Sequence, residues 1–138
     1  MNLNNTNPIL PIFDNTWTLF LDRDGVINER IPNDYVKSVK EFSFFSGVPL
    51  AMEKIEPVFG HIFIVTNQQG IAKGLMTEND LAKVHRHLKK TIENLGGRID
   101  KIYYCAEKSP SPCRKPNTGM AEQAKRDFPN IDFSRSVM

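Results

Sequence analysis

Two carboxylates, Asp22 and Asp24, lie two positions apart in the stretch LFLDRDGVINER. An apolar run precedes Asp22 and a glycine follows Asp24, so both are expected where a buried strand gives way to a turn. Carboxylates held close together repel one another unless a cation or a shared proton lies between them. Mg²⁺ suits such a pair because it binds oxygen ligands and keeps room for water and a substrate phosphate. One carboxylate could then attack phosphorus while the other moves protons, although an ordinary acidic turn explains the spacing equally well.

Two further polar clusters carry groups suited to an anion. The stretch VTNQQG offers the Thr66 hydroxyl, the Asn67 amide and backbone N–H groups as donors to a phosphate oxygen. The stretch CRKPN places Arg114 and Lys115 just ahead of a predicted helix, where cations and backbone N–H groups attract anions. Each cluster alone is better explained as a polar turn or a solvated surface. Three such clusters on consecutive strand ends are much less common by chance.

The segments before these clusters have the pattern of strands buried on both faces. Four strands are predicted, at residues 17–22, 61–67, 101–106 and 135–138. Three helices are predicted between them, at residues 46–60, 77–97 and about 117–127. Alternating strands and helices predict an α/β fold in which a parallel sheet has helices on both faces. Ligands of such sheets bind at the carboxyl ends of the strands, where all three clusters fall.

The predicted helix at residues 77–97 has the clearest signals. Thr77 and Asp80 resemble a capping box at its start, and two glycines end it. His85 and His87 lie two positions apart and therefore face different ways, so we do not expect them to chelate a metal; His85 is expected to be a packed histidine. Apolar residues form one stripe at helical spacing: Leu81, Val84, Leu88, Ile92 and Leu95.

Length and composition predict one ordinary soluble domain. The 138 residues are 40% hydrophobic and 25% charged, and a net charge of +2 supports neither a nucleic-acid nor a membrane partner but excludes neither. An Asn- and Pro-rich N-terminal arm is predicted at residues 1–16, ahead of a domain at 17–138. No apolar run approaches the roughly 18 residues of a membrane span, and the start is no signal peptide, so a cytoplasmic location is predicted. In that reducing compartment Cys105 and Cys113 are expected to be thiols or metal ligands rather than a bridge.

The stretches FLDRDGVIN, IVTNQQGIAKG and CRKPNTGM resemble the first three motifs of the haloacid dehalogenase-like (HAD) phosphatases. The match is best to the subgroup of D-glycero-D-manno-heptose 1,7-bisphosphate phosphatases and histidinol-phosphate phosphatases, which lack a large cap domain. The resemblance covers residues 17–138. It implies a Rossmann-like three-layer sandwich with a parallel sheet.

The resemblance also implies a role for each matching residue. Asp22 would be the nucleophile that forms an aspartyl-phosphate, and Asp24 the general acid and base. Thr66 would bind the transferring phosphoryl group and Lys115 would neutralise it. Mg²⁺ would be held by the Asp22 carboxylate and the backbone carbonyl of Asp24, with Arg23 pointing elsewhere. Further substrate contacts are implied for Asn28, Asn67, Gln68 and Arg114.

Two features depart from the family pattern. The family's fourth motif is an acidic loop that supplies another metal carboxylate. This motif and the last strands are expected to be missing, so we expect a C-terminally incomplete fold. The 138-residue chain is therefore expected to be poorly active as a monomer. Relatives often carry a zinc loop C-x-H…C-x-C before R-K-P. Cys105 and Cys113 match its outer ligands, but Glu107 and Ser111 replace the other two. Zinc is therefore not expected, and a loop with two free thiols is.

The leading interpretation is a Mg²⁺-dependent phosphatase acting on a small phosphorylated metabolite, D-glycero-D-manno-heptose 1,7-bisphosphate. Histidinol phosphate is the alternative substrate, because the same motifs serve both. A non-catalytic module that binds phosphate or a partner protein stays open, because the fourth motif is absent. A nucleic-acid 3′-phosphatase is less well supported, since neither a strongly basic surface nor an aromatic stacking platform is evident. The oligomeric state is not predicted.

Overall fold

The computed structural model describes residues 10–138. In this part of the chain a parallel sheet has four strands in the order β3-β2-β1-β4. The strands are β1 (Thr18–Leu21), β2 (His61–Asn67), β3 (Lys101–Cys105) and β4 (Ser136–Val137). The helices are α1 (Val48–Ile55), α2 (Glu78–Asn94) and α3 (Gly119–Asp127), with 3₁₀ turns η1 (Val39–Glu41) and η2 (Phe133–Arg135). The helices lie in the connections because parallel neighbours need a crossover.

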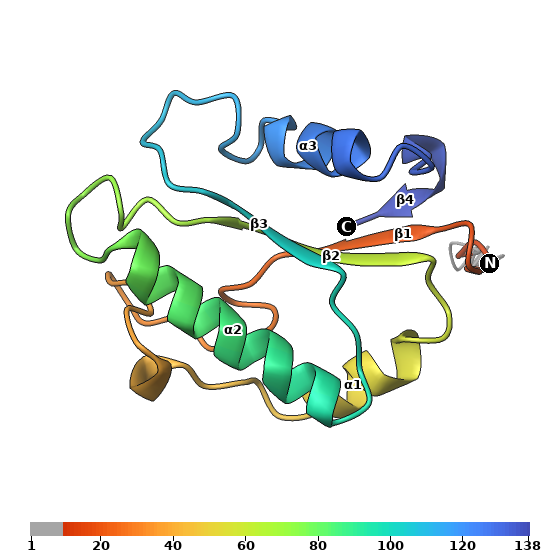
Figure 1. Ribbon diagram of the computed structural model, residues 1–138, viewed down its shortest axis with the longest axis horizontal. Coiled ribbons are helices and arrows are strands. Elements are labelled where there is room, and N and C mark those ends of the chain that lie inside the picture. The colour runs from red at the N-terminus through yellow and green to blue at the C-terminus, as the bar shows by residue number, and fades with distance from the viewer. Residues whose placement is uncertain (1–9) are drawn as a thin grey trace, which may run out of the picture.

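The sheet is the middle layer of three. Figure 1 shows α1 and α2 on one face and α3 on the other. Successive side chains of β2 point to opposite faces, so Ile62 and Ile64 pack with residues of α1 and α2, while Phe63 and Val65 pack with α3. Both faces of β2 are therefore buried, which explains its unbroken apolar run. The predicted three-layer α/β architecture is confirmed.

The predicted elements are present, with shifts at their ends; the largest is in α1, which ends at Ile55 instead of residue 60. The strand predicted at residues 61–67 has those same bounds, and the capping box of Thr77 and Asp80 forms at the start of α2. Helix α1 begins after Gly47, which has a φ of 82°, rather than at residue 46 as predicted. Positive φ is unfavourable for residues that carry a Cβ. Glycine has none and adopts this conformation at no steric cost.

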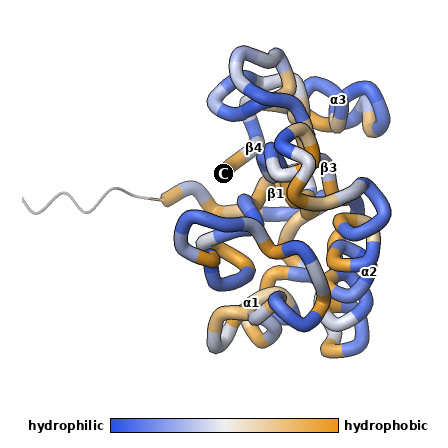
Figure 2. Tube along the Cα trace, turned by 90° about the vertical axis from the view of Figure 1, so that its left-hand side faces the viewer, coloured by the Kyte–Doolittle hydropathy of each residue, from blue (hydrophilic) through white to orange (hydrophobic). Residues whose placement is uncertain are grey.

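Helix α2 has one buried face. Its colour alternates between hydrophobic and hydrophilic along its length in Figure 2. Leu95 was predicted to belong to the buried stripe but is 52% exposed, because the helix ends at Asn94 and the chain turns there. The buried residues of the helix are Leu81, Val84, His85, Leu88 and Ile92.

The start of the chain lies partly outside the described residues. Residues 1–9 of the predicted arm are not described, but Phe13 packs against Trp17 and Phe59, with ring centroids 5.1 and 5.2 Å apart. The end of the predicted arm is thus attached to the core. Within residues 10–138, no helix has the length and apolar character needed to span a membrane.

Candidate active site

A cavity of about 310 Å³ lies where β1 and β2 end, at the carboxyl edge of the sheet. Gly25 has a φ of 87°, which lets the chain turn directly after Asp22 and Asp24. The Arg23 carbonyl accepts backbone hydrogen bonds within this turn, from Val26, Ile27 and Asn28. This tight turn keeps the carboxylates beside the strand end. The cavity is lined by six of the eight residues predicted for the site: Asp22, Asp24, Thr66, Asn67, Arg114 and Lys115.

Asp22 and Lys115 form the centre of the site. Lys115 Nζ lies 2.9 Å from Asp22 Oδ1 and also donates to the Val65 carbonyl over 2.8 Å. The backbone N–H of Arg23 donates to the same Asp22 oxygen over 2.8 Å. Two donors therefore fix one carboxylate oxygen, and the side chain remains 37% exposed toward the cavity. An exposed, oriented carboxylate beside a cation is suited to attack on an anionic phosphoryl group.

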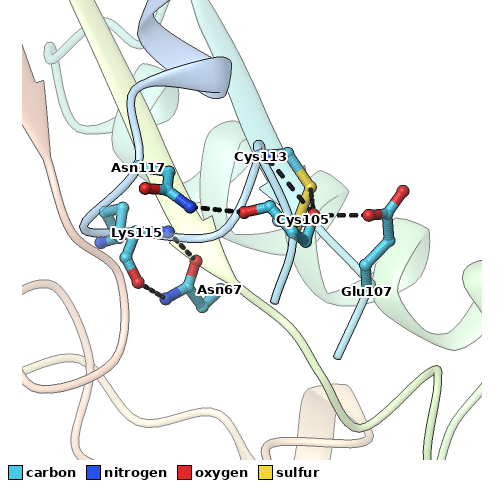
Figure 3. The surroundings of a disulfide bond; sticks show 7 residues. Asn67, Cys105, Glu107, Cys113, Lys115 and Asn117 are labelled. Atoms are coloured by element: carbon cyan, nitrogen blue, oxygen red, sulfur yellow. Dashed lines mark hydrogen bonds between the residues drawn. A yellow bond between two sulfur atoms is a disulfide. The ribbon is translucent and has the colours of Figure 1, made fainter. Parts of the chain in front are cut away.

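Thr66 supplies a hydroxyl at the end of β2. Its Oγ1 accepts a hydrogen bond from Gln68 Nε2 over 2.9 Å, which leaves its own proton for donation toward the cavity. Asn67 makes a reciprocal pair with the backbone of Lys115: the Lys115 N–H donates to Asn67 Oδ1 over 2.9 Å, and Asn67 Nδ2 donates to the Lys115 carbonyl over 3.2 Å. Figure 3 shows this pair. It ties the loop that carries Lys115 to the end of β2.

Asp24 is held on both carboxylate oxygens. Oδ1 accepts from Arg23 Nη2 and Asn28 Nδ2, each over 2.9 Å, and Oδ2 accepts from Gln68 Nε2 over 2.8 Å and Arg23 Nη2 over 3.1 Å. Burial raises the pKa of the Asp24 carboxyl, but the Arg23 charge and the hydrogen bonds outweigh burial and lower this pKa below its usual value. Asp24 is therefore a carboxylate at neutral pH.

Asn28 and Gln68 do not lie where substrate contacts were predicted. Both side chains are fully buried, and neither lines the cavity. Their amide nitrogens donate to the Asp24 carboxylate from the protein interior and not from the cavity. Asn28 does so from the turn after β1, and Gln68 from the end of β2. Sequence patterns identified the stretches that contain them but not the direction of their side chains.

Six residues that line the cavity were not predicted for the site. Arg30 and Tyr35 come from the loop after β1, where no motif distinguishes them from surface residues. Tyr35 packs on Gly70, where an added Cβ would lie 3.0 Å from the Tyr35 ring, so the two loops beside the cavity are in close contact. The set is completed by Ile31, Asp34, Val36 and Gln69.

The four positions that correspond to the relatives' zinc loop converge, but the cysteines are not free. Cys105 and Cys113 form a disulfide, with Cα atoms 5.5 Å apart (Figure 3), so the prediction of two free thiols is wrong. The loop returns to its starting point, which brings the cysteines within bonding reach. Ser111 Oγ donates to Glu107 and lies 3.3 Å from Cys113 Sγ. The absence of zinc stays a prediction.

Reducing the disulfide is expected to lower the free energy of unfolding by roughly 2–3 kcal/mol, because the bond closes a loop with a sequence separation of 8. Urea unfolding of the purified protein with and without dithiothreitol measures this. The double variant Cys105→Ala, Cys113→Ala is the control and should not respond to the reductant. Equal unfolding midpoints for the oxidised and reduced wild type would contradict the expectation.

The donor set at Asp22 and Asp24 fits Mg²⁺. The Asp22 carboxylate and the Asp24 backbone carbonyl are hard oxygen ligands, the type that Mg²⁺ prefers, and the cavity leaves room for water and a phosphate. Both Asp24 carboxylate oxygens already accept hydrogen bonds, which leaves the backbone carbonyl as this residue's candidate ligand.

Comparisons with known proteins identify relatives. The family model described as polynucleotide kinase 3 phosphatase matches residues 12–137. A D-glycero-alpha-D-manno-heptose-1,7-bisphosphate 7-phosphatase of Mycobacterium bovis is 38% identical over 88% of this chain and 65% of that protein. One of Campylobacter jejuni is also 38% identical, over 88% of this chain and 69% of that protein. The chain spans 56% of the length of a Mycobacterium tuberculosis relative that is 40% identical.

A solved structure supports the same relationship. D,D-heptose 1.7-bisphosphate phosphatase from B. bronchiseptica, complexed with magnesium and phosphate, superposes with a TM-score of 0.75 at 29% sequence identity. The superposition covers 82% of this chain and 64% of that chain. A second structure, a putative HAD-like phosphatase from Mesorhizobium loti, gives a TM-score of 0.72 at the same 29% identity over 91% of this chain.

Proposed function

This chain belongs to the HAD-like phosphatases, and from that membership we propose that the full protein hydrolyses a phosphomonoester of a small sugar bisphosphate, D-glycero-D-manno-heptose 1,7-bisphosphate. The observation that carries the proposal is the distance of 2.9 Å between Asp22 Oδ1 and Lys115 Nζ, in a cavity that Thr66 also lines. A nucleophile, a cation and a hydroxyl donor then surround one phosphoryl position. The proposed place of action is the cytoplasm.

The proposed reaction has two steps. Asp22 attacks phosphorus and forms an aspartyl-phosphate, while Lys115 and the Thr66 hydroxyl stabilise the charge on the phosphoryl oxygens. For the first step Asp24 must take up a proton from solvent, which it gives to the leaving oxygen. As a carboxylate it then takes a proton from the water that hydrolyses the intermediate. Arg23 favours the carboxylate form of Asp24, the form that the second step requires. Mg²⁺, held by the Asp22 carboxylate and the Asp24 carbonyl, would supply further charge neutralisation at the phosphoryl group.

The cavity supports a bisphosphate substrate through its arginines. Arg30 and Arg114 both line it, and a planar guanidinium is well matched to a phosphate. Arg114 Nη1 is buried and has no hydrogen-bond partner among the described residues, so no protein acceptor holds the guanidinium at that nitrogen. Asn67 contributes an amide to the same cavity, although it also holds the loop of Lys115.

A substrate panel tests this proposal. The full-length protein is assayed with the heptose 1,7-bisphosphate, histidinol phosphate and a 3′-phosphorylated oligonucleotide. The value of kcat/KM for the heptose bisphosphate should exceed the other two by about tenfold or more, because only this substrate satisfies both arginines. Faster hydrolysis of histidinol phosphate would reassign the substrate, and phosphate binding without turnover of any compound would favour a non-catalytic module.

A nucleic-acid 3′-phosphatase is the second candidate, because the matching family model is described as polynucleotide kinase 3 phosphatase. The oligonucleotide in the panel tests it directly. The net charge of +2 does not favour this candidate, since a nucleic-acid site needs several cations along the phosphate backbone.

Removing divalent metal is expected to lower turnover by about two orders of magnitude or more, since the metal offsets several kcal/mol of transition-state charge. The measurement is the hydrolysis rate after treatment with EDTA and after addition of excess Mg²⁺. Mg²⁺ should restore the rate. Full activity in EDTA would contradict a metal at Asp22 and Asp24.

A further inference from the structure

Arg23 is a charged residue buried beneath the candidate active site. Its side chain has no exposed surface, although it stands between the two aspartates of the cavity. A buried charge is costly unless it is paired and its donors are satisfied. Arg23 meets this need through a two-point contact with the Asp24 carboxylate. Its Nε and Nη2 donate to Oδ1 over 3.2 and 2.9 Å, and Nη2 also donates to Oδ2 over 3.1 Å.

The other end of the guanidinium is anchored on helix α2. Arg23 Nη1 lies 3.0 Å from His85 Nε2, across a sequence separation of 62 residues. An arginine can only donate, so His85 Nε2 is the acceptor and its proton is on Nδ1. Burial and the nearby Arg23 charge lower the pKa of His85 to about 3, which agrees with a neutral ring. The ring also packs edge-on against Tyr104, with centroids 6.0 Å apart.

These contacts leave the Asp24 carboxylate little freedom to rotate. The planar guanidinium is fixed at both ends, by His85 on one side and Asp24 on the other. Asn28 and Gln68 each add one donor, to Oδ1 and Oδ2 respectively. A carboxylate that transfers protons must point at the reacting oxygen, and a displacement of about 1 Å can reduce the rate roughly a hundredfold.

We propose that Arg23 and His85 are positioning residues, through which helix α2 sets the orientation of the Asp24 carboxylate for proton transfer. This inference rests on the proposed phosphatase function. Neither residue lines the cavity, so both act through Asp24 rather than on the substrate.

Substitutions at His85 separate this role from simple packing. Gln in place of His85 keeps an acceptor within reach of Arg23, whereas Asn keeps the polarity but is too short. His85→Asn should lower kcat about tenfold or more with KM changed less than twofold, because proton transfer and not binding is affected. His85→Gln should restore most of kcat. His87→Asn is the matched control on the same helix and should change neither constant, because His87 contacts the Phe42 ring instead.

A second variant tests the arginine itself. Arg23→Lys keeps the positive charge but loses the two-point contact, so kcat should fall by about two orders of magnitude in a protein that still unfolds cooperatively. Equal kcat for His85→Asn, His85→Gln and the wild type would overturn the proposal. An equal loss of kcat in both His85 variants would also overturn it, because the hydrogen-bond acceptor for Arg23 would then make no difference to the rate.

A measurement independent of turnover keeps this inference distinct from the proposed function. The ¹³C signal of the Asp24 carboxyl and the Nη signals of Arg23 are recorded by NMR in the full-length protein. His85→Asn should shift both sets of signals, while His85→Gln and His87→Asn should leave them close to those of the wild type. An unchanged Asp24 signal in His85→Asn would refute the positioning role, whereas the absence of hydrolysis in the wild type would refute only the phosphatase proposal.

Discussion

Asp22→Asn is expected to lower phosphatase turnover by a factor on the order of 10⁴ or more while leaving the fold intact. The amide has the size of the carboxylate but is a very poor nucleophile, so the aspartyl-phosphate cannot form. The amide oxygen of the substituted side chain can still accept the hydrogen bonds that Asp22 accepts from the Arg23 N–H and Lys115 Nζ, so little stability should be lost. The measurement is kcat with the heptose bisphosphate, together with the unfolding midpoint of each variant.

The control for this substitution is another aspartate at the opposite edge of the sheet. Asp14 lies before β1 and accepts hydrogen bonds from Thr16, and it does not line the cavity. Asp14→Asn should therefore leave kcat within about twofold of the wild type, as expected for a surface substitution away from the site. Normal turnover by Asp22→Asn would remove the nucleophile assignment and the proposed mechanism with it.

Lys115→Met is expected to lower kcat/KM by about 10²–10³, the effect typical of removing one preorganised electrostatic contact to a transition state. Methionine keeps most of the length and apolar volume of the side chain but lacks the charge. The Nζ group is the cation closest to the attacking carboxylate, at 2.9 Å from Asp22 Oδ1. Its loss leaves the developing phosphoryl charge less well neutralised.

Lys101→Met is the matched control. Lys101 is a surface lysine that pairs with Asp127 over 2.7 Å, outside the cavity. Exposed ion pairs contribute little, so this substitution should change neither kcat/KM nor the unfolding midpoint by much. Similar effects of the two substitutions would show that general charge, rather than the position of Lys115, matters for the rate.

Local sequence patterns predicted the frame of the molecule well. The apolar run of β2 and the capping box of Thr77 depend on neighbouring residues only, and both appear in the structure as predicted. The convergence of Asp22 and Lys115 followed from a general rule, because parallel strands place their carboxyl ends at one edge of the sheet. These features required no knowledge of how distant side chains pack.

Contacts between distant side chains could not be predicted. Nothing in a single sequence pairs Arg23 with His85, because the contact depends on how α2 packs under the end of β1. The directions of Asn28 and Gln68 were missed for the same reason, since a buried amide and an exposed one look identical in a motif. The disulfide was missed because the prediction relied on the redox compartment, whereas the loop path decides whether two sulfur atoms meet.

The reciprocal pair between Asn67 and the Lys115 backbone has a consequence for how the protein can vary. This pair holds the backbone of Lys115 against the end of β2, and the Cys105–Cys113 disulfide joins the two ends of the loop formed by residues 106–112. Insertions or deletions among the exposed residues 108–110 would then alter the surface of the loop while the ammonium group keeps its place beside β2. This segment is accordingly where new surface features can be introduced at little cost to the chemistry beneath.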